Sequence, residues 1–118
     1  MTARIVMTES GGIAGTVNVL TVETNLTATY QTRQGRRSGK ITAQSMASLV
    51  AAFYDNGFFA MKPDYRPQPM IADGITTTID YRDARRSKIV STGTNAGAPA
   101  ALNAIERALK SIVTEIGR

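Results

Sequence analysis

Apolar and polar residues alternate in five segments of the chain, as they do in β-strands with one buried face. Leu26, Ala28 and Tyr30, for example, are separated by threonines, so the three apolar side chains share one face of an extended chain. The same alternation, together with many β-branched residues, predicts strands at 4–9, 16–22, 26–32, 75–81 and 88–92. The first three segments follow one another closely, which favours a meander of three strands.

Two further segments repeat apolar residues every three or four positions, as a helix with one buried face does. The first helix is predicted to begin after Thr42, whose hydroxyl can cap it, and to end before Gly57. The second begins around Pro99, a residue that suits the first turn of a helix. The apolar positions are Met46, Leu49, Val50 and Phe53 in the first helix, and Leu102, Ile105, Leu109, Ile112, Val113 and Ile116 in the second.

The element order βββαββα predicts an α+β fold. We expect an antiparallel sheet of four to five strands with both helices on one face. A chain of 118 residues fits a single domain over residues 1–118, with one core that needs no disulfides. The other face of the sheet would be solvated or used for binding. Its residues would include Thr27, Thr29, Thr76, Thr78 and Asp80.

The chain contains no cysteine and no histidine, which removes several kinds of chemistry. Thiolate nucleophiles, Ser-His catalysis and the usual zinc ligands are all excluded. The acidic residues are scattered along the sequence and suggest no catalytic carboxylate pair. We therefore predict a protein that is not an enzyme and that has no cofactor and no metal site.

The net charge of +5 is moderate and fits either a soluble surface or an anionic partner. No apolar segment approaches the roughly 20 residues that a membrane-spanning helix needs. The segment at 1–6 lacks the apolar stretch of a signal peptide and leads directly into a strand. We expect a cytoplasmic protein that does not bind membranes, with export left open.

The glycine-rich turn between the first two strands is the leading candidate for a binding site. It contains Gly11, Gly12, Ile13, Ala14 and Gly15. Glycine is favoured where the backbone needs a positive φ or approaches another molecule closely, so at least one of these glycines should have a positive φ. Ile13 is either an exposed anchor for a partner or a side chain folded back onto the sheet.

Two groups of basic residues form an alternative site, which would bind anions. Guanidinium groups match phosphate oxygens, so such groups can contact nucleic acid. Stacking aromatic side chains would also be expected, but the nearby Tyr30 and Tyr81 are predicted to face the core. We therefore rank nucleic-acid binding below protein binding. The basic residues are Arg33, Arg36 and Arg37 in one group, and Arg82, Arg85 and Arg86 in the other.

Several blocks of sequence resemble a known family. They are Ser-Gly-Gly-Ile-Ala-Gly at 10–15, Asp-Asn-Gly-Phe-Phe-Ala-Met at 55–61, Asp-Gly-Ile-Thr-Thr-Thr-Ile-Asp-Tyr at 73–81, Ser-Lys-Ile-Val-Ser at 87–91 and Ala-Pro-Ala-Ala-Leu at 98–102. In this order they resemble the emfourin family of bacterial inhibitors of thermolysin-like zinc metalloproteases. The resemblance implies a bacterial metalloprotease as partner. A rigid glycine-rich turn with an apolar Ile13 is compatible with entry into the hydrophobic pocket of such a protease, but the resemblance itself assigns no contact residues.

The second half of the chain also resembles an uncharacterised bacterial domain found in small lipoproteins. The shared features are the Phe-Phe pair, a downstream Tyr, Asp-Gly and the spacing Pro-x-x-Leu. That family usually has cysteines in its first strands, and this sequence has none. Two hypotheses follow: a protein-binding or inhibitor module that uses the glycine-rich turn, and a basic module that binds nucleic acid. The sequence indicates no oligomeric state.

Overall fold

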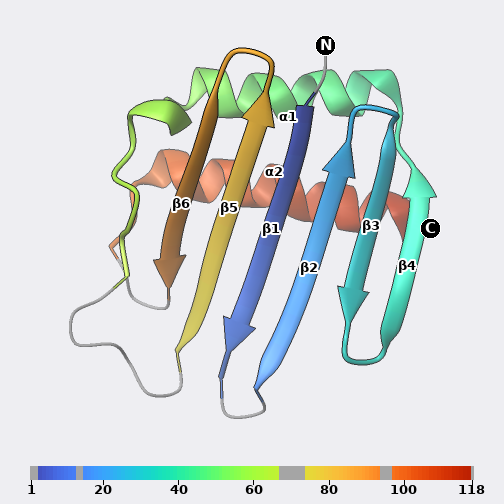
Figure 1. The fold of residues 1–118 in the computed structure, drawn as a ribbon, viewed down its shortest axis with the longest axis horizontal. Helices are drawn as coiled ribbons and strands as arrows, with labels where there is room; N and C mark the ends of the chain where they lie inside the picture. Colours follow the sequence, from blue (N-terminus) through green and yellow to red (C-terminus); the bar gives the residue numbers. More distant parts are fainter. Residues whose placement is uncertain (1–2, 13–14, 67–73, 94–96, 118) are drawn as a thin grey trace.

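Antiparallel pairing joins six strands into one sheet, in the order β4-β3-β2-β1-β5-β6 (Figure 1). The computed structural model describes residues 3–12, 15–66, 74–93 and 97–117. The elements are β1 (Ala3–Gly11), β2 (Thr16–Glu23), β3 (Thr27–Thr32), β4 (Gly35–Lys40), α1 (Ala43–Asp55), the 3-10 helix η1 (Phe58–Ala60), β5 (Ile75–Asp83), β6 (Ser87–Gly93) and α2 (Ala100–Ile116).

Both α-helices lie on the same face of the sheet, so every strand except the edge strand β4 has one buried and one open side (Figure 1). In the central strand β1, Ala3, Ile5 and Met7 are buried, whereas Arg4, between Ala3 and Ile5, is exposed. The neighbouring strands keep this alternation, because Ile5 pairs with Val22 of β2 and with Tyr81 of β5. The predicted α+β fold, the antiparallel sheet and the two helices are confirmed.

The predicted number of four to five strands is wrong, because the sequence pattern gave no sign of β4. Its sequence, Gly-Arg-Arg-Ser-Gly-Lys, has no apolar residue to mark a buried face. Backbone pairing with β3 defines the strand, and Tyr30 lies opposite Arg37. Gly39 lets β4 pass close to α2, since a Cβ at this position would lie 3.1 Å from the Cβ of Ile116.

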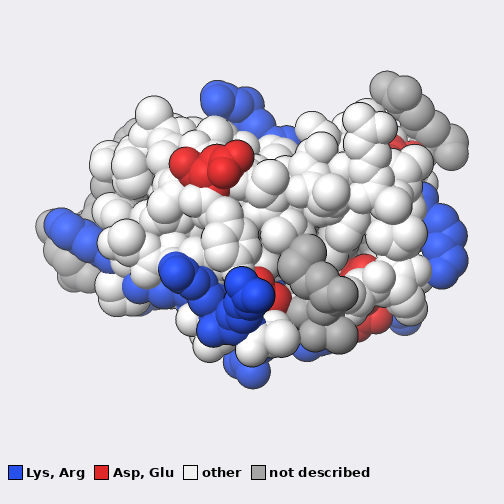
Figure 2. Space-filling view, turned by 90° about the horizontal axis from the view of Figure 1, so that it is seen from above, with Lys and Arg blue, Asp and Glu red and all other residues white. Residues whose placement is uncertain are grey.

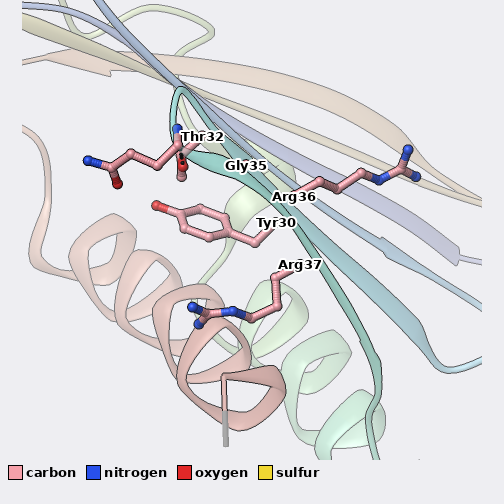
Figure 3. Close-up of a pocket in the computed structure, with 6 residues that line it drawn as sticks. Tyr30, Thr32, Gly35, Arg36 and Arg37 are labelled. Atoms are coloured by element: carbon pink, nitrogen blue, oxygen red, sulfur yellow. Dashed lines mark hydrogen bonds between the residues drawn. The ribbon is translucent and has the colours of Figure 1, made fainter.

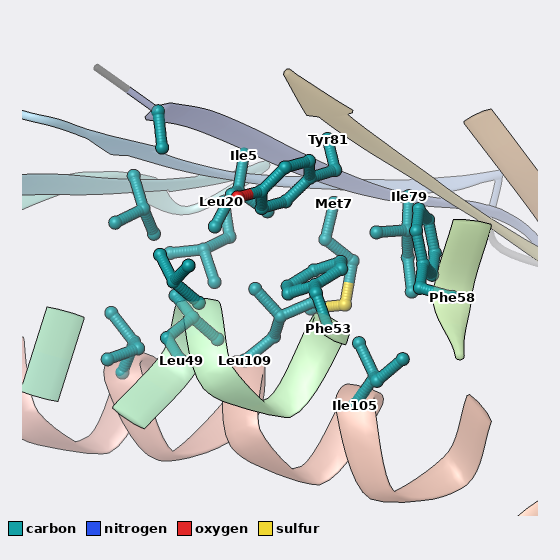
Figure 4. Packing of buried hydrophobic residues seen from close by; sticks show 14 of the residues in the cluster. Ile5, Met7, Leu20, Leu49, Phe53, Phe58, Ile79, Tyr81, Ile105 and Leu109 are labelled. Carbon is teal, nitrogen blue, oxygen red and sulfur yellow. The ribbon is translucent and has the colours of Figure 1, made fainter. Parts of the chain in front are cut away.

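A cluster of aromatic rings fills the core between α1 and β5 (Figure 4). The ring of Phe53 lies 4.7 Å from that of Tyr81 and 4.8 Å from that of Phe58. Ile105 and Leu109 of α2 are fully buried in the same cluster, as predicted. Phe59 of η1 is only partly buried and packs against the core.

Glu115 near the end of α2 binds the beginning of α1. Its carboxylate accepts hydrogen bonds from the backbone N–H of Thr42, at 3.2 Å, and from the hydroxyl of Ser45, at 2.7 Å. Thr42 caps α1 as predicted, because its side chain accepts a bond from the Ser45 N–H at 2.9 Å. A carboxylate at a helix N-terminus also interacts favourably with the helix dipole. Among the described helices, none is long and apolar enough to cross a membrane.

Candidate functional site

The glycine-rich turn has the backbone conformation that its sequence predicted. Gly11, Gly12 and Gly15 have φ values of 115°, 78° and 63°. The prediction that at least one of them has a positive φ is confirmed. Ile13 and Ala14 lie outside the described residues, so the exposure of Ile13 stays a prediction.

Backbone hydrogen bonds fix this turn against the beginning of β5. Gly12 donates its N–H to the carbonyl oxygen of Gly74 at 3.2 Å, and Gly15 donates to the carbonyl oxygen of Gly12 at 3.2 Å. At Gly11 a Cβ would lie 2.5 Å from the Gly74 oxygen, a distance that side chains do not tolerate. Only glycine allows the two backbone segments to approach this closely.

Two exposed apolar side chains flank the turn. Val17 of β2 is 48% exposed and Ile75 of β5 is 41% exposed. They belong to the same end of the sheet, since Val17 pairs with Ser10, and Ile75 pairs with the adjacent Gly11. The same register puts Val17 on the open face and Ile75 on the helix face, so one exposed apolar side chain lies on each side of the fixed turn.

The six arginines of the alternative site do not form one patch. Arg33, Arg36 and Arg37 belong to the β3–β4 hairpin, and Arg82 and its neighbours belong to the β5–β6 hairpin, at the opposite edge and the opposite end of the sheet (Figure 1). Even neighbours diverge, because Arg36 points away from the helices and Arg37 points toward them (Figure 3). Basic side chains accordingly form separate groups in the space-filling view (Figure 2).

Asp83 organises the tip of the β5–β6 hairpin. Its carboxylate accepts hydrogen bonds from the hydroxyls of Tyr81 and Tyr54, at 2.6 and 2.7 Å. It also accepts bonds from the backbone N–H groups of Arg85 and Arg86, at 2.7 and 2.8 Å. These bonds, that from Tyr81 foremost, hold the pKa of Asp83 well below its usual range. Burial and the bond to Asp83 raise the pKa of Tyr81 far above its usual value.

Arg86 packs its guanidinium group on aromatic rings. The group lies 5.1 Å from the centre of the Phe59 ring and 5.8 Å from that of Tyr54. Such cation–π contacts stabilise the hairpin against α1 and η1. Arg86 therefore has a structural role, since its guanidinium group packs on two aromatic rings.

We did not foresee the bonds of Asp83 from the sequence, although a signal for part of them was present. An aspartate at the first position of a turn often accepts bonds from the backbone two residues later. Its contacts with Tyr54 and Tyr81 depend on the docking of α1, which local sequence does not reveal. In the described part of the chain, no three acidic, histidine or cysteine residues lie close enough together to hold a metal ion.

We compared the sequence with models of known protein families. Residues 18–113 match the family described as Domain of unknown function (DUF6438), and the chain belongs to that family. A comparison with curated proteins finds no match.

Replacing Gly11 by alanine should destabilise the protein more than replacing Gly15. Both positions have a positive φ, which costs an L-residue roughly 1–2 kcal/mol. At Gly11 the new Cβ would also collide with the Gly74 oxygen, whereas at Gly15 it would meet open space. Urea denaturation of both variants measures the difference. Equal losses of stability would show that the close approach at Gly11 does not constrain the turn.

The bonds to Asp83 predict a pH dependence of stability. Because its pKa is lower in the folded protein than in the unfolded one, its ionised form stabilises the fold above about pH 4. This contribution is lost as the pH falls through the folded pKa. We therefore expect Asp83→Asn to reduce the free energy of unfolding at neutral pH, and the gap from the unmutated protein to shrink below about pH 4. A gap that stays constant down to about pH 2 would contradict this role.

Proposed function

Because membership of this family assigns no activity, we propose from the geometry that the protein is a non-catalytic protein-binding module. Its contact surface is the glycine-rich turn at 11–15 together with the flanking Val17 and Ile75. The observation that supports this proposal most strongly is the combination of three glycines with positive φ, fixed by backbone bonds, with exposed apolar side chains on either side.

The fixed turn favours binding in two ways. A segment that is already ordered loses little conformational entropy when a partner binds. Gly12 and Gly15 also carry no side chain that would keep a partner away from their peptide groups, and Gly15 has open space around its Cα. Apolar side chains at the rim then add area that is removed from water on binding.

We propose that the partner is a bacterial metalloprotease of the thermolysin type, which the protein inhibits. The resemblance of the turn at 10–15, the helix end at 55–61 and the stretch from 73 to 102 to emfourin-type inhibitors supports this partner. Ile13, between the glycines, is the apolar side chain that would enter the hydrophobic pocket of the protease. Anchors buried at the centre of an interface often dominate the binding energy.

Nucleic-acid binding is the weaker alternative. A basic surface binds the phosphate backbone through several neighbouring cations, and the arginines considered for it lie on two separate hairpins. The aromatic rings of Tyr54 and Phe59 lie next to Arg86, but they already pack against each other and against the guanidinium group of Arg86. We therefore expect the protein to bind nucleic acid only weakly and in a salt-sensitive manner.

Inhibition assays with single variants test the proposed function. If the protein inhibits a thermolysin-like protease, Ile13→Asp and Val17→Asp should each weaken inhibition at least tenfold, about 1.4 kcal/mol. In either variant, the new carboxylate would have to be buried in the apolar contact with the protease. The melting temperature of the free protein should hardly change.

The matched control for this assay is Ile89→Asp. Ile89 is 48% exposed, like Val17, and lies on β6, away from the turn. Its replacement should leave inhibition unchanged. The proposal fails if the unmutated protein inhibits no member of a panel of such proteases, or if Ile89→Asp weakens inhibition as much as Val17→Asp does.

A further inference from the structure

The two edges of the sheet differ in how they are covered. At the β6 edge, Tyr65 donates its N–H to the Ser91 oxygen at 2.7 Å, and Ser91 donates to the Pro63 oxygen at 2.9 Å. The chain therefore adds a short parallel bridge of its own next to β6. Within the described residues, β4 at the other edge pairs with β3 alone. An edge strand without a neighbour presents backbone groups that can pair with another chain.

The register identifies the backbone groups that point outward from β4. Ile41, directly after the strand, donates its N–H to the Leu26 oxygen at 2.9 Å, in the same register as the rest of the pair. Antiparallel pairs alternate between bonded and non-bonded residues, so every second residue of β4 bonds to β3. The bonded residues are Gly35, Arg37 and Gly39. The N–H and C=O groups of Arg36, Ser38 and Lys40 consequently point away from the sheet.

The side chains of this edge carry positive charge on both faces. Arg36 and Lys40 lie on the open face, and Arg37 lies on the helix face, near Gly117 at the end of α2. The strand itself contains no acidic residue. A second copy that paired edge to edge would bring these cations close together, which is unfavourable. An acidic strand would bring opposite charges together instead.

A hollow borders this edge on the helix face, and a second one on the open face reaches it at Arg36. On the helix face, a hollow of about 310 Å³ is lined by Tyr30, Thr32 and Arg37, among others (Figure 3). On the open face, a hollow of about 260 Å³ lies mainly over β2 and β3, where Glu23 and Gln31 line it, and extends to Arg36 of β4. Successive side chains of an added strand point to opposite faces, so each face would receive every second side chain.

We propose that the β4 edge is a second binding surface, which takes an acidic, extended peptide segment of a partner protein as a seventh strand. Backbone bonds to Arg36, Ser38 and Lys40 supply the pairing, and the cations select an acidic sequence. This mode of binding, strand addition at a sheet edge, takes affinity from the main chain and specificity from alternate side chains. It is separate from the glycine-rich turn, so either proposal can fail while the other holds.

Two designed peptides test this proposal with the full chain. The first is an eight-residue peptide in which glutamate alternates with valine, and the second has lysine in place of glutamate. NMR titration should show binding of the glutamate peptide, with the largest amide shift changes at Arg36, Ser38 and Lys40. The lysine peptide should not bind, and added salt should weaken binding of the glutamate peptide.

Two pairs of variants separate the backbone contribution from the charge contribution. The N–H of Ser38 points away from β3, so Ser38→Pro removes an outward N–H and no bond to β3. Proline is tolerated at such positions of an edge strand. Ser38→Pro should abolish binding, whereas Ser38→Ala, which keeps the N–H, should retain it. Arg36→Glu should weaken binding at least tenfold. Arg107→Glu, the same charge change at an exposed position of α2, should not.

The charge pair decides the outcome if Ser38→Pro does not fold. Four results would overturn the proposal. They are no binding of the glutamate peptide at millimolar concentration, equal binding of the lysine peptide, shift changes that map away from β4, and dimers of the protein that pair through β4.

Discussion

Burial on only one side of the sheet is the constraint on which the rest of this structure depends. Two α-helices cover one face of six strands, and none of the described helices lies over the opposite face (Figure 1). The strands packed against the helices therefore alternate apolar and polar residues, as β1 does at Ile5 and Arg4, whereas the edge strand β4 does not. The surfaces that we propose for binding lie where this arrangement ends, at a turn beyond the covered region and at an edge strand.

The polar bonds at the boundary keep the layers in register. Glu115 ties the end of α2 to the beginning of α1, and Asp83 ties the β5–β6 hairpin to α1 through Tyr54. Both carboxylates accept bonds from backbone N–H groups as well as hydroxyls. Hydrogen bonds to a charged group are stronger than those between neutral groups. The two carboxylates can therefore hold helices and strands together at the exposed rim of the core.

The sequence predicted those elements whose stability depends on a buried face. The stripes of Leu49 and Phe53, or of Ile105 and Leu109, gave the helices, because burial imposes a period on the sequence. It gave no sign of β4, which is held by backbone bonds and by the close approach of Gly39 to α2. Backbone pairing imposes no such period, so a strand of this kind is invisible to pattern analysis.

The candidate sites show the same division. The positive φ of the glycine-rich turn could be predicted, since glycine is the residue that such a backbone requires. The distribution of the arginines could not, because Arg36 and Arg37 are neighbours in sequence and point to opposite faces once β4 forms. The contact of Tyr54 with Asp83 depends on how α1 docks, which only the assembled core determines.

Native-state hydrogen exchange tests the central claim most directly, that the one-sided sheet ends in an edge with free backbone groups. The account predicts alternation along β4, with protected amides at Arg37 and Gly39 and fast exchange at Arg36, Ser38 and Lys40. The central strand β1 pairs on both sides and should show protection at successive residues. Protection of Arg36, Ser38 and Lys40 equal to that of β1 would contradict the account, because it would mean that the edge is already paired.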